Sequence, residues 1–94
     1  MVFVYILTSA PGGKLYVGKA DDLRKRIEQH LSGAVNSYTR DHAIRTLVYF
    51  ELHETQQQAL TREKLLKRWR RQWKINLIES VNPDWRDVSN QIPL

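Results

Sequence analysis

The spacing of apolar and polar residues predicts three strands in this chain. Residues 2–8, VFVYILT, are β-branched and aromatic, which is typical of a buried central strand. A turn with two glycines at 10–13 leads into a second short strand at 14–17, so the two runs predict a hairpin. A third run, TLVYFEL at 46–52, completes a small antiparallel sheet.

A first helix is predicted after the hairpin. Gly18 lets the chain leave the sheet, because glycine has no Cβ in the way. Asp21 or Asp22 then caps a helix that runs to about Leu31, with an acid at its positive end. Residues 34–45 have mixed polarity and are predicted to form a loop.

The last third of the chain is predicted to be helical. Residues 55–58, TQQQ, have the form of a capping box that opens a helix reaching about residue 70. Further helical turns are expected over 73–79, although the letters INLIES also fit a strand. The order β-β-α-β-α-α predicts an α+β fold, in which a three-stranded antiparallel sheet is flanked by helices. One domain is expected over 1–88, with 89–94 as a flexible C-terminal tail.

Composition excludes several classes of site. The chain has no cysteine, so disulfides, thiolate metal sites and cysteine nucleophiles are excluded. No apolar run approaches the length of a membrane span, and the N-terminal run lacks the basic leader of a signal peptide. These features predict a soluble cytoplasmic protein.

Positive charge is concentrated in one predicted helix. The net charge is +5, and residues 62–74 hold seven basic residues against one acid. Such a stripe is expected of a protein that binds a polyanion such as nucleic acid, although a solvated basic helix face is an equally ordinary interpretation. The residues are Arg62, Lys64, Lys67, Arg68, Arg70, Arg71 and Lys74.

Polar residues interrupt the apolar faces of two predicted helices. Arg26 and His30 lie one turn apart, at the edge of the stripe that ends in Leu31. His30 can simply pack there, and Arg26 can extend its charge to water. Glu63 lies within roughly 40° of Ala59 on the core-facing side of its helix, where a carboxylate is costly unless it is paired or bound to a metal. An ion pair with a nearby arginine is the alternative to a functional role.

Aromatic residues have two possible roles. Tyr5 and Tyr16 are predicted to share one face of the hairpin, where an aromatic pair is usually structural. Trp69, Trp73 and Trp85 are expected in the core, and Ala59, Leu66 and Trp73 are predicted to share one helix face. An exposed tryptophan would instead be able to stack on a base.

An ordered set of motifs resembles the GIY-YIG nuclease superfamily, in particular its small standalone bacterial members. The resemblance covers residues 2 to about 88. It departs from the family's pattern at Val4, where the name-giving glycine would stand, and at Lys19-Ala20, where a small hydroxylated residue is usual. The matching positions are VYI at 4–6, YVG at 16–18, Arg26 and His30 on the next helix, Glu63 in ALTREKLLKRW and Asn82 in ESVNPDW.

The resemblance implies metal-dependent hydrolysis of a DNA phosphodiester with one Mg²⁺ or Mn²⁺. Glu63 would supply a hard oxygen ligand, and Arg26 would hold phosphate oxygens in a bidentate fork. One of the two tyrosines would take a proton from water, helped by His30, the metal or the other phenol, because a free phenol has a pKa of about 10. The implied catalytic residues are Tyr5, Tyr16, Arg26 and His30, the metal ligand is Glu63, and Gly18 and Asn82 are further site positions.

The expected partner is DNA, including branched or damaged DNA, with RNA as an alternative, and the protein is expected to be a monomer or a weak homodimer. A separate DNA-binding domain is not expected, so weak sequence specificity and salt-dependent backbone binding are predicted. An inactive nucleic-acid-binding module of the same fold and a protein-interaction domain built on the tryptophans are the alternatives. The expected nucleic-acid-binding residues are Lys19, Arg40, Arg62, Lys67, Arg70, Arg71 and Lys74.

Overall fold

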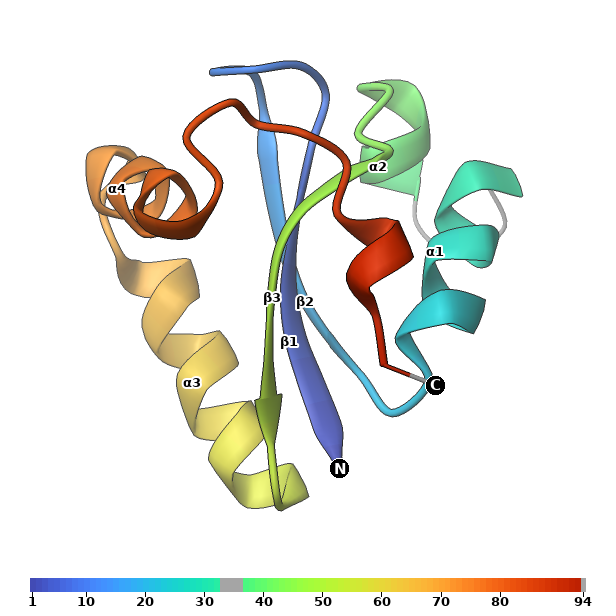
Figure 1. Cartoon of the computed structure of the whole chain (residues 1–94), viewed down its shortest axis with the longest axis vertical. Helices are drawn as coiled ribbons and strands as arrows, with labels where there is room; N and C mark the ends of the chain where they lie inside the picture. Colours follow the sequence, from blue (N-terminus) through green and yellow to red (C-terminus); the bar gives the residue numbers. More distant parts are fainter. Residues whose placement is uncertain (33–36, 94) are drawn as a thin grey trace.

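The computed structural model describes residues 1–32 and 37–93 and has the predicted α+β fold (Figure 1). Its sheet has three antiparallel strands in the order β2-β1-β3, so β1 is central and β2 is an edge strand. No helix in the described part of the chain is long and apolar enough to cross a membrane. The elements are β1 (Val2–Thr8), β2 (Leu15–Ala20), α1 (Leu23–Ser32), α2 (Ser37–Asp41), β3 (Thr46–His53), α3 (Gln56–Arg68), α4 (Arg71–Val81) and the 3₁₀ turn η1 (Ser89–Gln91).

Helices cover both faces of the sheet, which separates the core into two clusters. In Figure 1, α3 and α4 lie on one side of the strands, while α1, α2 and η1 lie on the other. Because side chains alternate along β1, Val4 and Ile6 pack toward α3 and α4, whereas Phe3 and Tyr5 pack toward α1. All seven residues of β1 are buried.

Helix starts follow the predicted capping residues. Asp22 caps α1, since its Oδ1 accepts a hydrogen bond from the Lys25 backbone N–H at 3.1 Å. Thr55 caps α3 in the same way, accepting from the Gln58 N–H at 3.1 Å. The Gln58 side chain accepts from the N–H of Glu54 rather than from that of Thr55, so the capping box is shifted by one residue.

Several predicted boundaries are wrong. The strand β2 continues through Gly18 to Ala20, so Gly18 is not where the chain leaves the sheet. Residues 37–41 form the short helix α2 within the segment predicted as a loop; residues 33–36 lie outside the described part. The helical turns predicted over 73–79 are confirmed as part of α4, so only the alternative of a strand for INLIES is wrong.

Two apolar faces also differ from the prediction. Leu31 is 56% exposed, and His30 takes its place on the buried side of α1 with Leu23 and Ile27. Trp73 is 51% exposed and belongs to α4, because extended backbone at Trp69 and Arg70 ends α3 before it.

The segment predicted as a loose tail is packed against the domain. Ile92 is 5% exposed and lies in the α1-side cluster. The Arg24 guanidinium donates a hydrogen bond to the Ile92 carbonyl at 2.7 Å. A local sequence pattern shows neither the burial of Ile92 nor its hydrogen bond to a distant arginine. The composition of 89–94 therefore did not reveal this contact.

Candidate active site

The phenol of Tyr5 lies over Gly18, and this contact requires glycine. The two residues are paired across β1 and β2. A Cβ built on Gly18 would stand 2.5 Å from both Cζ and Oη of Tyr5, which no side chain tolerates. Gly18 therefore serves close approach of a tyrosine rather than exit of the chain from the sheet.

His30 links the Tyr5 phenol to Thr39 through a buried hydrogen-bond chain. The Tyr5 oxygen is 3.1 Å from His30 Nε2, and His30 Nδ1 is 3.1 Å from the Thr39 hydroxyl. His30 and Thr39 are each 1% exposed. A neutral imidazole donates a hydrogen bond through one nitrogen and accepts one through the other. The tautomer of His30 therefore decides whether it donates to Tyr5 and accepts from Thr39, or the reverse.

Burial and nearby charges favour the uncharged forms of both His30 and Tyr5. Burial lowers the pKa of His30, and the positive charge of Arg26 lowers it further, so the imidazole is uncharged at neutral pH. Burial also raises the pKa of the Tyr5 phenol, and negative charge on Tyr16 and on Glu63 adds to this effect. Arg26 opposes the rise in the pKa of Tyr5 through its charge and a hydrogen bond.

Three rings gather around the buried phenol. Tyr5 and Tyr16 have centroids 6.4 Å apart, and Tyr16 and His30 are 5.3 Å apart in an edge arrangement. The two tyrosines therefore lie on the same face of the sheet, as predicted. Tyr5 is fully buried whereas Tyr16 is half-buried, so only the Tyr16 ring has access to solvent.

Glu63 approaches from the other helix layer. It lies on α3, and its side chain is 14% exposed. Its carboxylate is 3.3 Å from the ammonium of Lys67, one helical turn on, so the ion pair expected as an alternative forms with a lysine rather than an arginine. The site thus combines the hairpin of β1 and β2 with side chains of α1 and α3.

A cation at this site would have one protein carboxylate. Among residues 1–32 and 37–93, no three His, Cys, Asp or Glu side chains are grouped closely enough to hold a metal ion. Mg²⁺ in proteins often keeps several waters and takes one or two carboxylates together with phosphate oxygens. The single carboxylate of Glu63 fits that coordination, and it does not fit a site made wholly of protein ligands.

Asn82 is not brought to this site. It caps α4, and its side-chain amide donates to the carbonyls of Val48 at 2.9 Å and Arg86 at 2.8 Å. Its oxygen accepts from the Arg86 N–H at 3.0 Å. Val48 lies on β3, at the sheet edge opposite β2. The structure gives Asn82 a role in fixing the turn after α4, and this turn is what its Asn-Pro sequence also suggests.

The basic residues expected to bind nucleic acid divide into two groups. Arg62 faces inward, where it donates to Glu51 at 2.9 Å and lies over the Trp69 ring at 5.3 Å. Arg71 donates to the carbonyls of Gly12 and Gly13 in the β1–β2 turn. These contacts make both arginines part of the packing of α3 and α4.

The other members of the set differ in their contacts and in their exposure. Lys19 donates to Gln56 at 3.2 Å, and Arg40 pairs with Asp41 at 3.2 Å. Arg70 is exposed with its guanidinium 5.9 Å from the Trp73 ring centroid. Lys67 is exposed although it pairs with Glu63, and Lys74 is half-buried.

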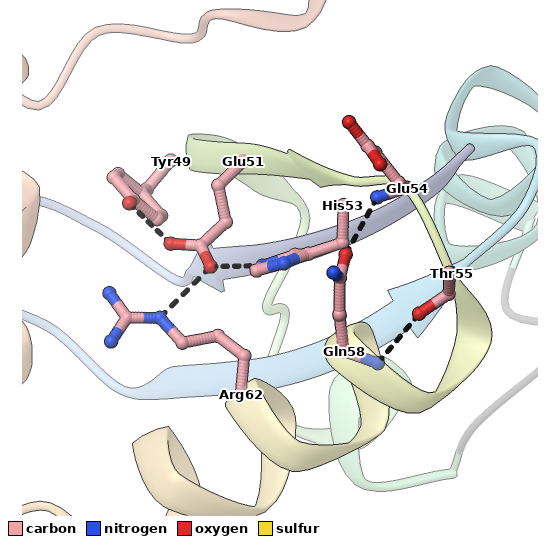
Figure 2. Close-up of polar contacts among 7 residues, drawn as sticks. All are labelled: Tyr49, Glu51, His53, Glu54, Thr55, Gln58 and Arg62. Carbon is pink, nitrogen blue, oxygen red and sulfur yellow. Dashed lines mark hydrogen bonds and ion pairs between the residues drawn. The ribbon is translucent and has the colours of Figure 1, made fainter.

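Sequence reasoning missed a polar cluster between β3 and α3 (Figure 2). One Glu51 oxygen accepts from Tyr49 at 2.6 Å; the other lies 2.6 Å from His53 Nε2 and accepts from Arg62. Burial alone would raise the pKa of Glu51, but these hydrogen bonds outweigh burial and the pKa is lowered. Burial and the bond to Glu51 raise the pKa of Tyr49 to about 12. Polar residues at 49, 51 and 53, alternate positions of one strand, were the available signal.

Known proteins resemble this chain along most of its length. UPF0213 proteins of Staphylococcus aureus, including those of strains Mu3 and N315, are 42% identical over 77 residues, which is 82% of this chain and 93% of each of those proteins. The solution NMR structure of a UPF0213 protein from Bacillus halodurans matches with a TM-score of 0.57 and 26% identity, covering 100% of both chains.

The GIY-YIG catalytic domain family matches residues 1–76. That range includes both tyrosines of the site, Arg26, His30 and Glu63, and it ends before Asn82. Because the match spans most of the chain and contains the residues that surround the buried phenol, this chain belongs to the GIY-YIG family of nuclease-like catalytic domains.

Proposed function

We propose that this protein is a metal-dependent endonuclease that hydrolyses DNA phosphodiester bonds with little sequence specificity. One observation carries the proposal: in a GIY-YIG chain, the phenol of Tyr5 is hydrogen-bonded to His30 and lies within the electrostatic reach of both Arg26 and Glu63. A group that would bind phosphate and a group that would hold a metal thus lie around one hydrogen-bonded phenol, and phosphodiester hydrolysis needs both functions.

The two tyrosines have different roles in this proposal. Tyr5 is 0% exposed and its oxygen is held by His30, so an attacking water does not reach it. Tyr16 is half-buried beside the same imidazole, with its ring 5.3 Å from that of His30. We therefore assign to Tyr16 the role of general base, which requires that its phenol has first given up its own proton so that the phenolate oxygen can take one from water, and to Tyr5 the task of orienting His30.

Arg26 and Glu63 complete the proposed chemistry. Arg26 would bind the phosphate oxygens through its planar fork of donors, which suits the developing charge of the transition state. Glu63 would hold Mg²⁺ or Mn²⁺, which neutralises charge on the scissile phosphate when bound. Lys67 pairs with one oxygen of Glu63 in the free protein, so a bound cation would compete with its ammonium for this carboxylate.

Substrate binding would rely on the phosphate backbone. The exposed cations Lys67 and Arg70 belong to the same stretch of chain as Glu63. Contacts of this kind position a nucleic acid without reading its sequence, so duplex, branched and damaged DNA are all proposed substrates. One chain supplies every residue of the site, which agrees with action as a monomer or a weak homodimer.

Nicking of supercoiled plasmid tests the proposal. The purified protein should convert it to open circles with Mg²⁺ or Mn²⁺ but not with a chelator. Arg26→Gln should lower the rate by about a hundredfold or more, the range seen when one charge-stabilising group is removed. Lys25→Gln, which removes an exposed neighbouring charge, should leave the rate within a few-fold of wild type. No cleavage of plasmid, branched DNA, single strands or RNA by folded protein would refute the enzymatic function.

The ion pair between Glu63 and Lys67 supports one alternative, a nucleic-acid-binding module without turnover. If the ammonium holds this carboxylate permanently, the metal position is filled by the protein itself. Such a module would bind DNA with an affinity that falls steeply with salt, and Glu63→Gln would leave that affinity unchanged.

A further inference from the structure

Trp73 is exposed on the surface although it is one of the largest apolar side chains. It is 51% exposed, whereas Trp85 is 8% exposed and donates a hydrogen bond to Glu79 at 2.8 Å. Trp69 is half-buried and packs on the α3-side core. A single large aromatic ring displayed at a helix junction is a common feature of binding surfaces.

The exposed ring forms one wall of a shallow groove. The groove has a volume of about 370 Å³ and runs along α4 from the α3–α4 junction. Trp69 and Trp73 meet edge to face, with centroids 6.1 Å apart and planes at 85°, so the two rings present differently oriented surfaces. No acidic residue lines the groove, whose described lining is Trp69, Trp73, Asn76, Leu77 and Ser80.

Positive charge lies directly beside the ring. The guanidinium of Arg70 is 5.9 Å from the Trp73 centroid, and Arg70 is exposed. Arg71 and Lys74 follow on the first turn of α4, but they do not line the groove, and Arg71 donates to the Gly12 and Gly13 carbonyls instead. An anion bound against the Trp73 ring would be attracted by the Arg70 guanidinium.

We propose that the Trp73 groove binds single-stranded nucleic acid, with a base stacked on Trp73 and a neighbouring phosphate held by Arg70. An aromatic ring beside an arginine matches the alternation of base and phosphate along a strand. Bases in an intact duplex are stacked on one another and have no free face for Trp73. The groove therefore selects unpaired nucleotides, such as those of a flap, gap or loop.

A second copy of this chain is a less suitable occupant. A symmetric contact through the groove would bring the exposed Arg70 of both copies into one interface. Like charges opposed in this way weaken association, whereas a polyanion is attracted by them.

The inference narrows the substrate class of the proposed nuclease, but its test does not depend on cleavage. Fluorescence anisotropy of a labelled oligothymidylate, measured with a chelator present, gives the affinity for single strands; a hairpin duplex of matched length gives the comparison. Wild-type protein should bind the single strand more tightly, and its tryptophan fluorescence should be quenched on binding. Trp73→Leu should weaken single-strand binding by about tenfold and remove most of the quenching, while duplex binding changes little.

Leu65→Ala is the matched control, because Leu65 is 45% exposed on α3 and lies outside the groove. It should leave both affinities within a factor of two. Equal binding of single strand and duplex, or an unchanged affinity in Trp73→Leu, would overturn the inference. A dimer that Trp73→Leu dissociates, with no effect on oligonucleotide binding, would also overturn it and identify a self-interface. Single-strand binding by a protein that never cleaves would leave the inference standing and reject only the nuclease proposal.

Discussion

At the scale of single residues, the position of the Tyr5 phenol depends on a missing Cβ at Gly18. The motif order in the sequence placed both residues in the site, and the structure adds why they occur together. Thr39 was noticed in the sequence only as part of a polar stretch, yet it is the buried partner of His30. No local pattern links positions 30 and 39, because their contact depends on how α1 and α2 pack.

Gly18→Ala should destabilise the fold. The added methyl would meet the ring of Tyr5, so we expect the free energy of unfolding to fall by about 1–3 kcal/mol, as for overpacked cores. Urea denaturation gives this value, and Lys19→Ala on the same strand is the control. In a Tyr5→Leu background the methyl has room, so most of the cost should disappear. An equal cost in both backgrounds would show that the ring is not responsible.

His30 should make stability depend on pH. Its pKa in the folded protein is lowered from the usual 6.5, so the unfolded chain binds a proton more readily. The stability from the neutral imidazole is therefore fully present above pH 6.5 and is lost as the pH falls through the folded-state pKa, by at most about 1.4 kcal/mol per pH unit. Urea titrations of wild type and His30→Gln, from roughly pH 8 to pH 5, measure how the free energy of unfolding of each protein changes across this window.

His42→Gln serves as the control, since His42 is exposed. The wild type and this variant should lose stability in parallel on acidification, and His30→Gln should lose less. Identical slopes for all three proteins would mean that His30 does not remain neutral in the folded state.

At the scale of elements, the placement of α3 depends on the cluster of Tyr49, Glu51, His53 and Arg62 (Figure 2). Arg62 is the residue before Glu63, so its bond to β3 also fixes the rotation of α3 about its axis. The sequence stripe from 62 to 74 suggested a continuous basic face. The structure instead ends α3 at Arg68 and turns Arg62 inward.

Glu51→Gln should lower the free energy of unfolding at pH 7 by roughly 1–3 kcal/mol, because the variant leaves Tyr49, His53 and Arg62 with a weaker acceptor. The folded-state pKa of Glu51 is lowered from 4.5, so its contribution is present above that pH and is lost as the pH falls through the folded value. Wild type and Glu51→Gln should therefore converge in strong acid. Glu54→Gln, an exposed neighbour, should match wild type throughout; a Glu51→Gln protein as stable as wild type at pH 7 would exclude the anchoring role.

At the scale of the whole molecule, the fold class and most of the site were predictable, whereas the arrangement of charge was not. The run of β-branched and aromatic residues at 2–8 and the capping residues Asp22 and Thr55 are local signals, and the elements they predict are present. The inward turn of Arg62 and the packing of Ile92 depend on contacts between distant segments, which periodicity cannot encode. The exposure of Trp73 follows from the break between α3 and α4, whereas the predicted helix face had grouped Trp73 with Ala59 and Leu66.

This arrangement predicts which arginines contribute to DNA affinity. Arg70→Gln should reduce the slope of log affinity against log salt by about one, because an exposed cation releases one counterion on binding phosphate. Arg62→Gln should leave the slope unchanged and lower stability instead, since its guanidinium is engaged by Glu51. Anisotropy titrations at several salt concentrations measure both slopes. A smaller slope for Arg62→Gln would show that this arginine leaves Glu51 to contact DNA.

The most direct test of the central claim is plasmid nicking by Glu63→Gln across a Mg²⁺ titration, with Glu28→Gln, an exposed acid on α1, as the control. We predict that Glu28→Gln nicks like wild type at every Mg²⁺ concentration. Glu63→Gln should nick at least about a hundredfold more slowly and show no saturation in the range where wild type saturates. Equal rates and equal Mg²⁺ dependence for Glu63→Gln and wild type would contradict a metal-dependent active site at Glu63.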